Sequence, residues 1–171
     1  MGDRLQSMRE AVARLRALAD VVFVDASPLY QTEPWEQRPG EVPDPESWFF
    51  NCVVAIDTTL PARELLAAVQ AIEDSLGRVR GTGTHESERY EPRPLDIDIL
   101  LYGDEVIAVS DALHVPHLLM HERGFVLRPL ADLAPDLQHP ALYQSMSELL
   151  HDLADEHDVR PGDYPRRWFD D

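Results

Sequence analysis

The spacing of hydrophobic residues in this chain switches between the period of a helix and that of a strand, and the order of the switches restricts the fold. Apolar residues recur every three or four positions over residues 3–18 and 61–76, which predicts two amphipathic helices. Short segments rich in β-branched and aromatic residues predict three strands, at 21–30, 48–57 and 94–102. The resulting order is helix, strand, strand, helix, strand.

That order predicts an α+β fold with a largely antiparallel sheet. It matches the ferredoxin-like βαββαβ pattern, with helices on one face of the sheet, except that the first strand is missing from this chain. Helices expected over 130–135 and 145–154 form a C-terminal helical appendage. We therefore expect a single domain over residues 1–155, followed by a charged tail at 156–171 whose order the sequence leaves open.

Composition excludes several functions. The chain carries 15 basic and 32 acidic residues, a net charge of −17, which argues against nucleic acid and anionic membranes as partners. All of its basic residues are arginine, so chemistry that depends on lysine is excluded. No apolar run approaches the roughly 20 residues that a membrane span needs. Its single cysteine, Cys52, excludes an internal disulfide and favours the reducing cytoplasm.

The segment from Arg93 to Leu101 is the sharpest candidate for chemistry. Residues two apart on a strand share a face, so Asp96 and Asp98 would point the same way, with their carboxylates roughly 6–7 Å apart. Two such carboxylates suit one or two Mg²⁺ ions, which prefer oxygen ligands. The alternative is an ordinary half-buried strand whose polar face lies in water.

Arginines cluster around this segment. Five of the fifteen lie nearby in the sequence, at positions 78, 80, 89, 93 and 123. Guanidinium groups bind phosphate oxygens bidentately, so in a chain this acidic the cluster predicts a triphosphate site. The alternative is that these arginines neutralise the aspartates and the nearby Glu86, Glu88 and Glu91.

Several motifs carry a family resemblance that runs from Gly2 to about residue 150. They are Tyr30-x-Thr32-Glu33-Pro34, Phe49-x-Asn51, Gly77-Arg78-Val79-Arg80, the run from Arg89 to Asp98, Val115-Pro116-His117, and the run from Arg123 to Leu130. In order and spacing the chain resembles the 6-hydroxymethyl-7,8-dihydropterin pyrophosphokinases, enzymes of folate biosynthesis.

The resemblance implies transfer of pyrophosphate from ATP, as co-substrate, to the hydroxymethyl group of the dihydropterin, with release of AMP and with two Mg²⁺ ions. Its partners would be these small molecules, with other folate-pathway enzymes as further candidates. Three alternatives stay open: an inactive relative that only binds nucleotide or a partner, another two-metal nucleotidyl or phosphoryl transferase on the same fold, and a metal-free regulatory module.

The resemblance also implies roles for individual residues. The metal ligands would be Asp96 and Asp98. The triphosphate would be held or charge-stabilised by Arg78, Arg80, Arg93, His117 and Arg123. The adenosine pocket would be lined by Leu66, Gln70, Glu73, Ile99 and Leu118. The pterin would contact Thr32, Glu33, Pro34, Phe49, Asn51, Tyr90 and Phe125.

The chain departs from the family pattern at three places. Glu91 stands where a small residue is usual, and Tyr90 replaces a more familiar tryptophan. Family members begin with an apolar strand and a Gly-Ser-Asn turn, whereas this sequence opens on Met1-Gly2-Asp3-Arg4. We therefore expect a start about ten residues upstream of Met1, the usual length of a strand and turn.

Overall fold

The computed structural model describes residues 4–34, 44, 48–77, 95–110 and 113–170. The chain forms two compact units, which are described in turn. Unit 1 comprises residues 1–22, 57–98 and 169–171, and unit 2 comprises residues 23–56 and 99–168.

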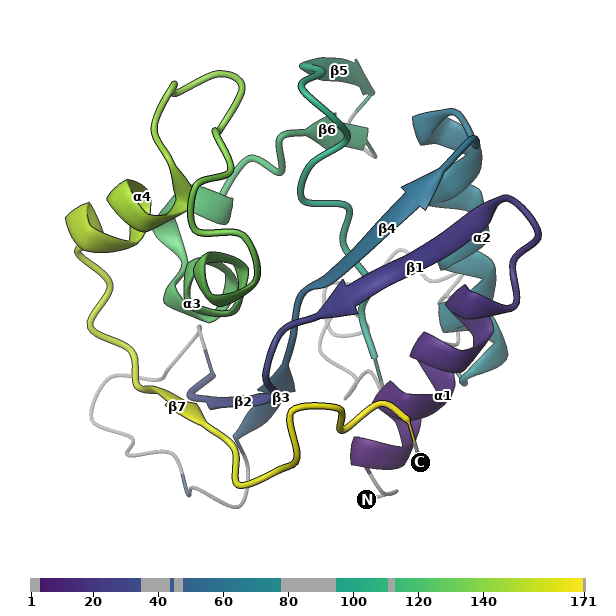
Figure 1. Ribbon diagram of the computed structural model, residues 1–171, viewed down its shortest axis with the longest axis horizontal. Helices are drawn as coiled ribbons and strands as arrows, with labels where there is room; N and C mark the ends of the chain where they lie inside the picture. Colours follow the sequence, from purple (N-terminus) through teal and green to yellow (C-terminus); the bar gives the residue numbers. More distant parts are fainter. Residues whose placement is uncertain (1–3, 35–43, 45–47, 78–94, 111–112, 171) are drawn as a thin grey trace, which may run out of the picture. The chain divides into compact units, whose positions relative to one another are not determined.

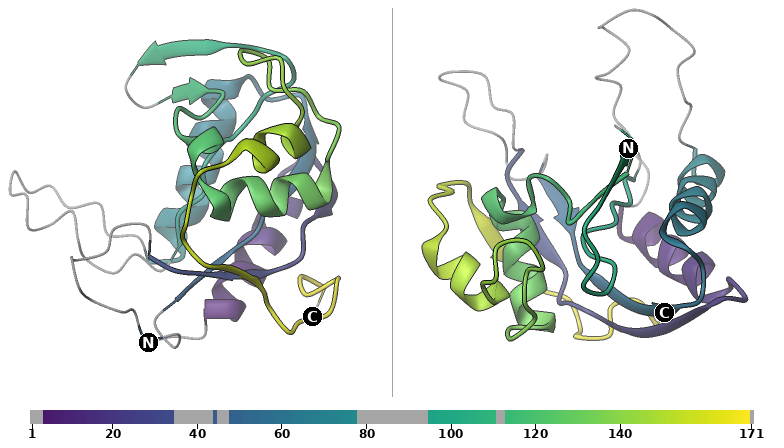
Figure 2. Two further views of the ribbon diagram at one scale, coloured as in Figure 1. Left: turned by 90° about the vertical axis from the view of Figure 1, so that its left-hand side faces the viewer. Right: turned by 90° about the horizontal axis from the view of Figure 1, so that it is seen from above.

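Unit 1 is built on the two predicted amphipathic helices. Helix α1 (Arg4–Arg16) packs against α2 (Ala62–Ser75), as Figures 1 and 2 show. Their facing apolar stripes are buried, and they consist of Met8, Ala11, Val12 and Leu15 on α1 and Leu65, Val69 and Ile72 on α2. Burial of these stripes stabilises helices that would be marginal alone. Gly77 follows α2 with φ 99°, a conformation that suits glycine.

The first two predicted strands each divide into two. Strands β1 (Val21–Ala26) and β4 (Val54–Thr58) pair with each other, and the boundary between the units runs through both. The break follows Ala26, where the Ser27 N–H donates to the Val53 carbonyl at 2.8 Å and the Val53 N–H donates to the Ser27 hydroxyl at 3.0 Å. The Ser27 hydroxyl thus accepts a hydrogen bond that a backbone carbonyl would accept in a regular ladder. The next residue, Pro28, has no N–H, so it cannot donate to a ladder.

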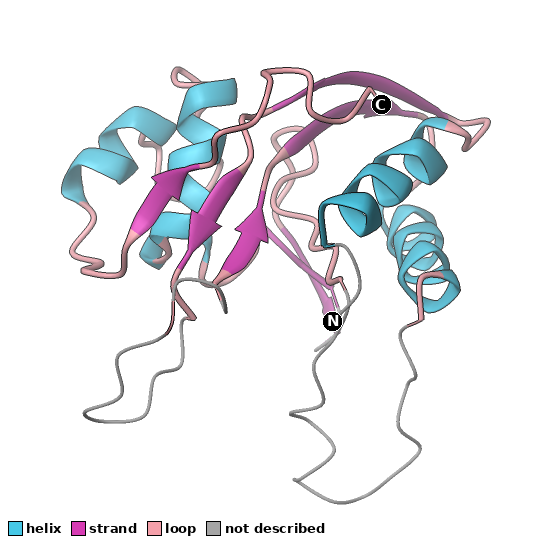
Figure 3. Cartoon of the chain, turned by 90° about the horizontal axis from the view of Figure 1, so that it is seen from below, coloured by secondary structure: helices cyan, strands magenta, loops and turns pink. Residues whose placement is uncertain are grey.

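Unit 2 contains a three-stranded antiparallel sheet in the order β3–β2–β7 (Figure 3). Its strands are Phe49–Asn51, Tyr30–Thr32 and Val159–Pro161. Helix α3 (Gly124–Leu133) packs against all three strands, and α4 (Met146–Asp152) packs against α3. A separate hairpin joins β5 (Ile107–Ser110) to β6 (Leu113–Val115).

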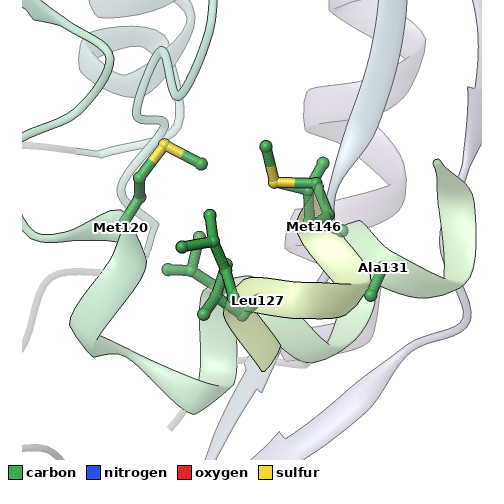
Figure 4. Packing of buried hydrophobic residues seen from close by; sticks show 7 residues of the cluster. Met120, Leu127, Ala131 and Met146 are labelled. Carbon is green, nitrogen blue, oxygen red and sulfur yellow. The ribbon is translucent and has the colours of Figure 1, made fainter. Parts of the chain in front are cut away.

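The core of unit 2 lies between α3, α4 and the short 3₁₀ helix Met120–Glu122. Figure 4 shows the side chains of Met120, Leu127 and Met146 pointing toward one another, and each is fully buried. The predicted capping box at Ser145 and Glu148 starts α4. Helix α3 begins earlier than the predicted residue 130. Its interior Pro129 lacks a donor, but the helix continues because burial of its apolar side outweighs that lost bond.

The expected third strand, at 94–102, is wrong as a strand assignment, because none of its described residues, 95–102, is in one. The expected alternation is present: Leu95, Ile97 and Ile99 are half-buried, whereas Asp96 and Asp98 are exposed. A strand needs a ladder, and the Ile97 N–H instead donates to a side chain of α2. The coarser prediction, a mixed fold of helices and small antiparallel sheets, is confirmed.

The tail that the sequence left open is structured. It supplies β7 and the fully buried Trp168, whose indole N–H donates to the Ser27 carbonyl at 3.0 Å. The division of the chain at residue 155 stays a prediction.

Candidate active site

The aspartate pair lies in unit 1, in an irregular segment that is bonded to helix α2. Both carboxylates are exposed, and the intervening Ile97 N–H donates to Glu73 Oε1 at 2.8 Å. Glu73 comes from α2 and is only 2% exposed. A buried carboxylate that accepts a backbone N–H fixes this segment in the orientation that turns Asp96 and Asp98 to solvent.

The predicted adenosine residues are divided between the units. Leu66, Gln70 and Glu73 recur at helical spacing and share one side of α2, where the first two are half-buried. These three belong to unit 1 with the aspartates. Ile99 and Leu118 belong to unit 2, where Ile99 is half-buried and Leu118 is 60% exposed.

The predicted pterin residues of unit 2 converge on strands β2 and β3. Thr32 lies opposite Phe49 in the ladder, and the Asn51 amide donates from Nδ2 to Thr32 Oγ1 at 2.6 Å. Thr32 is buried and Phe49 is 54% exposed, so a polar pair lies on the same strands as an accessible ring. Burial raises the pKa of the adjoining Cys52 to about 12, which keeps its thiol protonated and poorly nucleophilic.

The turn after β2 is held by the C-terminal segment. The Glu33 N–H donates to the Asp158 carbonyl at 3.1 Å, and the Asp158 N–H donates back to Glu33 Oε2 at 3.0 Å. Pro34 follows, half-buried. Sequence reasoning missed Asp158, because a charged, irregular tail carries no periodic signal.

Arg123 and Phe125 flank the first residue of α3. The Arg123 guanidinium carbon lies 5.6 Å from the centroid of the Phe125 ring, a cation–π arrangement. Between them, the Gly124 N–H donates to Asp155 Oδ2 at 2.6 Å. Asp155 is a second residue that sequence reasoning missed, since it lies thirty-one positions further along the chain.

His117 is held at both its backbone and its ring. Its N–H donates to the Leu100 carbonyl at 2.9 Å, and its Nδ1 accepts the Leu119 N–H at 3.3 Å. Because Nδ1 accepts, the proton of the neutral ring lies on Nε2. Nε2 is then a donor atom, the type of group that contacts a phosphate oxygen.

Four predicted site residues lie outside the described residues: Arg78, Arg80, Tyr90 and Arg93. The departure at Glu91 lies there as well. Their roles stay predictions.

The carboxylates fit magnesium. Within the described residues no three histidine, cysteine or acidic side chains gather to hold a metal ion. Mg²⁺, however, is commonly bound by one or two carboxylates together with waters and substrate phosphates, and the exposed oxygens of Asp96 and Asp98 suit that mode.

In the part of the chain that is described, no helix has the length and apolar character to cross a membrane.

Paired exposed carboxylates suit metal-assisted phosphoryl transfer. A sequence model described as 7,8-dihydro-6-hydroxymethylpterin-pyrophosphokinase matches residues 1–135. A 2-amino-4-hydroxy-6-hydroxymethyldihydropteridine pyrophosphokinase of Pseudomonas aeruginosa is 42% identical over 144 residues, 82% of this chain and 81% of that protein. The enzyme of that name from Methylorubrum extorquens is 42% identical over 138 residues, 80% of this chain and 78% of that protein. The chain belongs to the 7,8-dihydro-6-hydroxymethylpterin-pyrophosphokinase family, which confirms the predicted family and enzyme class.

A longer relative also matches. Folic acid synthesis protein fol1 of Schizosaccharomyces pombe is 37% identical over 155 residues, 90% of this chain. The chain spans only 19% of the length of that protein.

Proposed function

We propose that this protein transfers the β,γ-pyrophosphate of ATP to the hydroxymethyl group of 6-hydroxymethyl-7,8-dihydropterin and releases AMP. The family match supports the pterin substrate and the pyrophosphoryl transfer, and ATP is the co-substrate of the family. In this reaction the hydroxymethyl oxygen forms a bond to the β-phosphorus. The bond from that phosphorus to the α,β-bridging oxygen breaks, AMP leaves with that oxygen, and the hydroxyl proton is released to solvent.

The single observation that carries the proposal is the arrangement of Asp96 and Asp98. Both are exposed, and the Glu73 carboxylate holds the backbone between them. In the proposed reaction they would hold Mg²⁺, whose charge would offset that of the triphosphate. Pyrophosphoryl transfer needs positioning and charge neutralisation more than covalent help, so rigid placement of two carboxylates is the contribution expected of the chain.

The residues of unit 2 supply binding contacts in this proposal. The Thr32–Asn51 pair offers fixed polar groups to the edge of the pterin, and Phe49 and Phe125 offer ring faces. Arg123 and the Nε2 donor of His117 contact phosphate oxygens. Arg78, Arg80 and Arg93 are proposed for the same task from the sequence alone, as is Tyr90 for the pterin.

On α2, Leu66 and Gln70 are proposed to face the adenosine, as are Ile99 and Leu118 of unit 2. Glu73 was predicted for the same pocket, but it is 2% exposed and accepts the Ile97 N–H, so we propose that it acts through the aspartate segment. We also propose the ferredoxin-like arrangement for the fold. It is supported by the β1–β4 pair, which helix α1 precedes and helix α2 follows in the chain. The strand expected upstream of Met1, a cytoplasmic location and association with other folate-pathway enzymes stay predictions.

The identity of the nucleotide product tests the proposed function. ATP and 6-hydroxymethyl-7,8-dihydropterin are incubated with the protein and Mg²⁺, and the products are followed by ³¹P NMR. We expect AMP and a pterin pyrophosphate in equal amounts. Release of ADP or free pyrophosphate would indicate a different transferase on this fold, and binding of ATP without turnover would indicate an inactive relative.

A further inference from the structure

The start of helix α3 is held by a carboxylate from outside the helix. A helix leaves its first N–H groups without internal partners, and the N-cap residue Arg123 supplies no side-chain acceptor for them. Asp155 supplies it, because its Oδ2 accepts the Gly124 N–H at 2.6 Å. The Asp155 side chain is 1% exposed, so this contact is shielded from water.

A second set of contacts holds that carboxylate. Asp155 Oδ1 accepts the His157 N–H at 3.0 Å and lies 2.5 Å from Nδ1 of the same histidine. Burial by itself raises the pKa of Asp155, but the N–H donors of His157 and Gly124 outweigh burial and hold the pKa below its ordinary value. Asp155 is therefore charged at neutral pH, as a helix N-terminus favours.

The fit at Gly124 is close. A Cβ at this position would lie 2.9 Å from Asp155 Oδ2 and 3.4 Å from a methyl group of Val159. Only glycine brings the backbone this near to the carboxylate. The position of the Gly124 backbone determines where the side chains of the adjacent residues, Arg123 and Phe125, leave the main chain.

We propose that Asp155 is a positioning residue for the reaction, which acts through the Gly124 N–H to place Arg123 and Phe125. The proposal rests on the proposed function, in which those two residues contact phosphate and pterin. Asp155 lies beyond the residues, 1–135, that the family match covers. The chain thus uses a segment outside the family match to fix two residues inside it.

The test compares D155A and D155N with E156Q. The D155N amide keeps an acceptor oxygen for the Gly124 N–H, and E156Q removes an exposed negative charge from the next residue. kcat and KM for both substrates are measured at a temperature where each variant is fully folded by circular dichroism. Under those conditions a loss of stability alone leaves kcat/KM unchanged. Hydrogen exchange of the Gly124 amide is measured by NMR on the same samples.

We expect D155A to lower kcat/KM by roughly 10-fold or more, the usual effect of losing a hydrogen bond to a charged group, with faster Gly124 exchange. D155N should recover part of that loss, and E156Q should match the wild type. If D155A does not fold, D155N decides, because it keeps an acceptor but loses the charge, so a smaller loss of kcat/KM is expected. Wild-type kcat/KM in folded D155A, or in D155N when D155A does not fold, overturns the proposal. If the wild type shows no turnover, the proposed function has failed, and Gly124 exchange in folded D155A that matches the wild type would reject the positioning contact independently.

Discussion

The segment that carries Asp96 and Asp98 and the β3–β2–β7 sheet, which carries the proposed pterin residues, are built in different ways. Asp96 and Asp98 lie in a segment that belongs to no strand within the described residues, and the Glu73 carboxylate accepts the N–H of the residue between them. The proposed pterin residues Thr32 and Asn51 instead lie in paired strands with a defined register, and β7 pairs with β2 on its other side.

The difference matches the work proposed for each region. A flat heterocycle is read by fixed polar groups and ring faces, which a sheet supplies from several paired backbones. Metal and phosphate oxygens require exposed charge, and a segment with two exposed carboxylates supplies it. The consequence is that mutations in the first region should affect chemistry, and mutations in the second should affect binding.

The largest effect should come from the aspartates. D96A or D98A removes a proposed metal ligand, and charge stabilisation of several kcal/mol at the transition state should be lost. We expect AMP release to be abolished and the circular dichroism spectrum to be unchanged. D104N, which alters an exposed aspartate in a nearby turn, serves as the control. Near-native kcat of either alanine variant in saturating Mg²⁺ would refute the assignment.

A smaller loss is expected for R123A. Removal of a charged contact to phosphate costs about 1.5–3 kcal/mol, and the loss should fall on ATP use more than on pterin binding. KM for ATP and Kd for the pterin are measured on the same preparation. Arg128, exposed on the same helix, provides the control variant R128A. If R123A weakens binding of the pterin, measured without ATP, as much as it weakens ATP use, the phosphate role is contradicted.

Variants of Glu73 test whether its contact with the Ile97 N–H governs the aspartate segment. E73A leaves the Ile97 N–H without this acceptor, which costs about 1–3 kcal/mol for a buried group. We expect kcat/KM to fall accordingly, and E73Q, whose amide oxygen can still accept, to retain more of it. Kinetics of both variants, with E64Q of the same helix as the exposed control, give the answer. Equal activity of E73A and the wild type would show that the contact does not matter.

Asn51 should give the smallest kinetic effect. N51A removes the amide that bonds to Thr32 Oγ1, and loss of a neutral hydrogen bond costs about 0.5–1.5 kcal/mol. KM for the pterin should rise, while KM for ATP and kcat change little. Steady-state kinetics in each substrate separate these parameters. A fall in kcat at saturating pterin would place Asn51 with the chemistry instead.

The pH dependence of stability tests the contact between Asp155 and the Gly124 N–H at the start of α3. The folded pKa of Asp155 lies below its ordinary value, so its contribution is complete above the unfolded pKa of about 3.9 and is lost as pH falls through the folded value. The Tm advantage of the wild type over D155N should therefore be full near pH 7 and shrink below about pH 4. An advantage that stays constant from pH 7 to pH 3 would contradict this.

Sequence predicted local patterns well and long-range partners poorly. The stripes of α1 and α2, the Ser145–Glu148 capping box and the alternation around Asp96 and Asp98 all depend on near neighbours, and all are present. The break of the strands at Ser27 was not predicted, because a serine hydroxyl that replaces a ladder position is visible only once its partner Val53 is known.

The same limit applies to the candidate site. Residue types and spacing selected the aspartates as candidates, and the family resemblance selected the pterin motifs. They did not identify Asp155 or Asp158, because no periodic pattern marks a residue that bonds to a segment far away in the sequence. The assignment of 94–102 as a strand had the right alternation but required a paired neighbour that sequence alone does not provide.

The central claim is that the aspartate segment serves the chemistry and the sheet serves pterin binding. It is tested most directly by measuring AMP release from wild type, D98A and N51A over a range of pterin concentrations. The account predicts that N51A reaches the wild-type rate when pterin is saturating, and that D98A releases no AMP at any concentration. If the rate of N51A stays low at saturating pterin, the assignment of binding to the sheet is contradicted. If D98A releases AMP at high pterin concentration, the assignment of chemistry to the aspartate segment is contradicted.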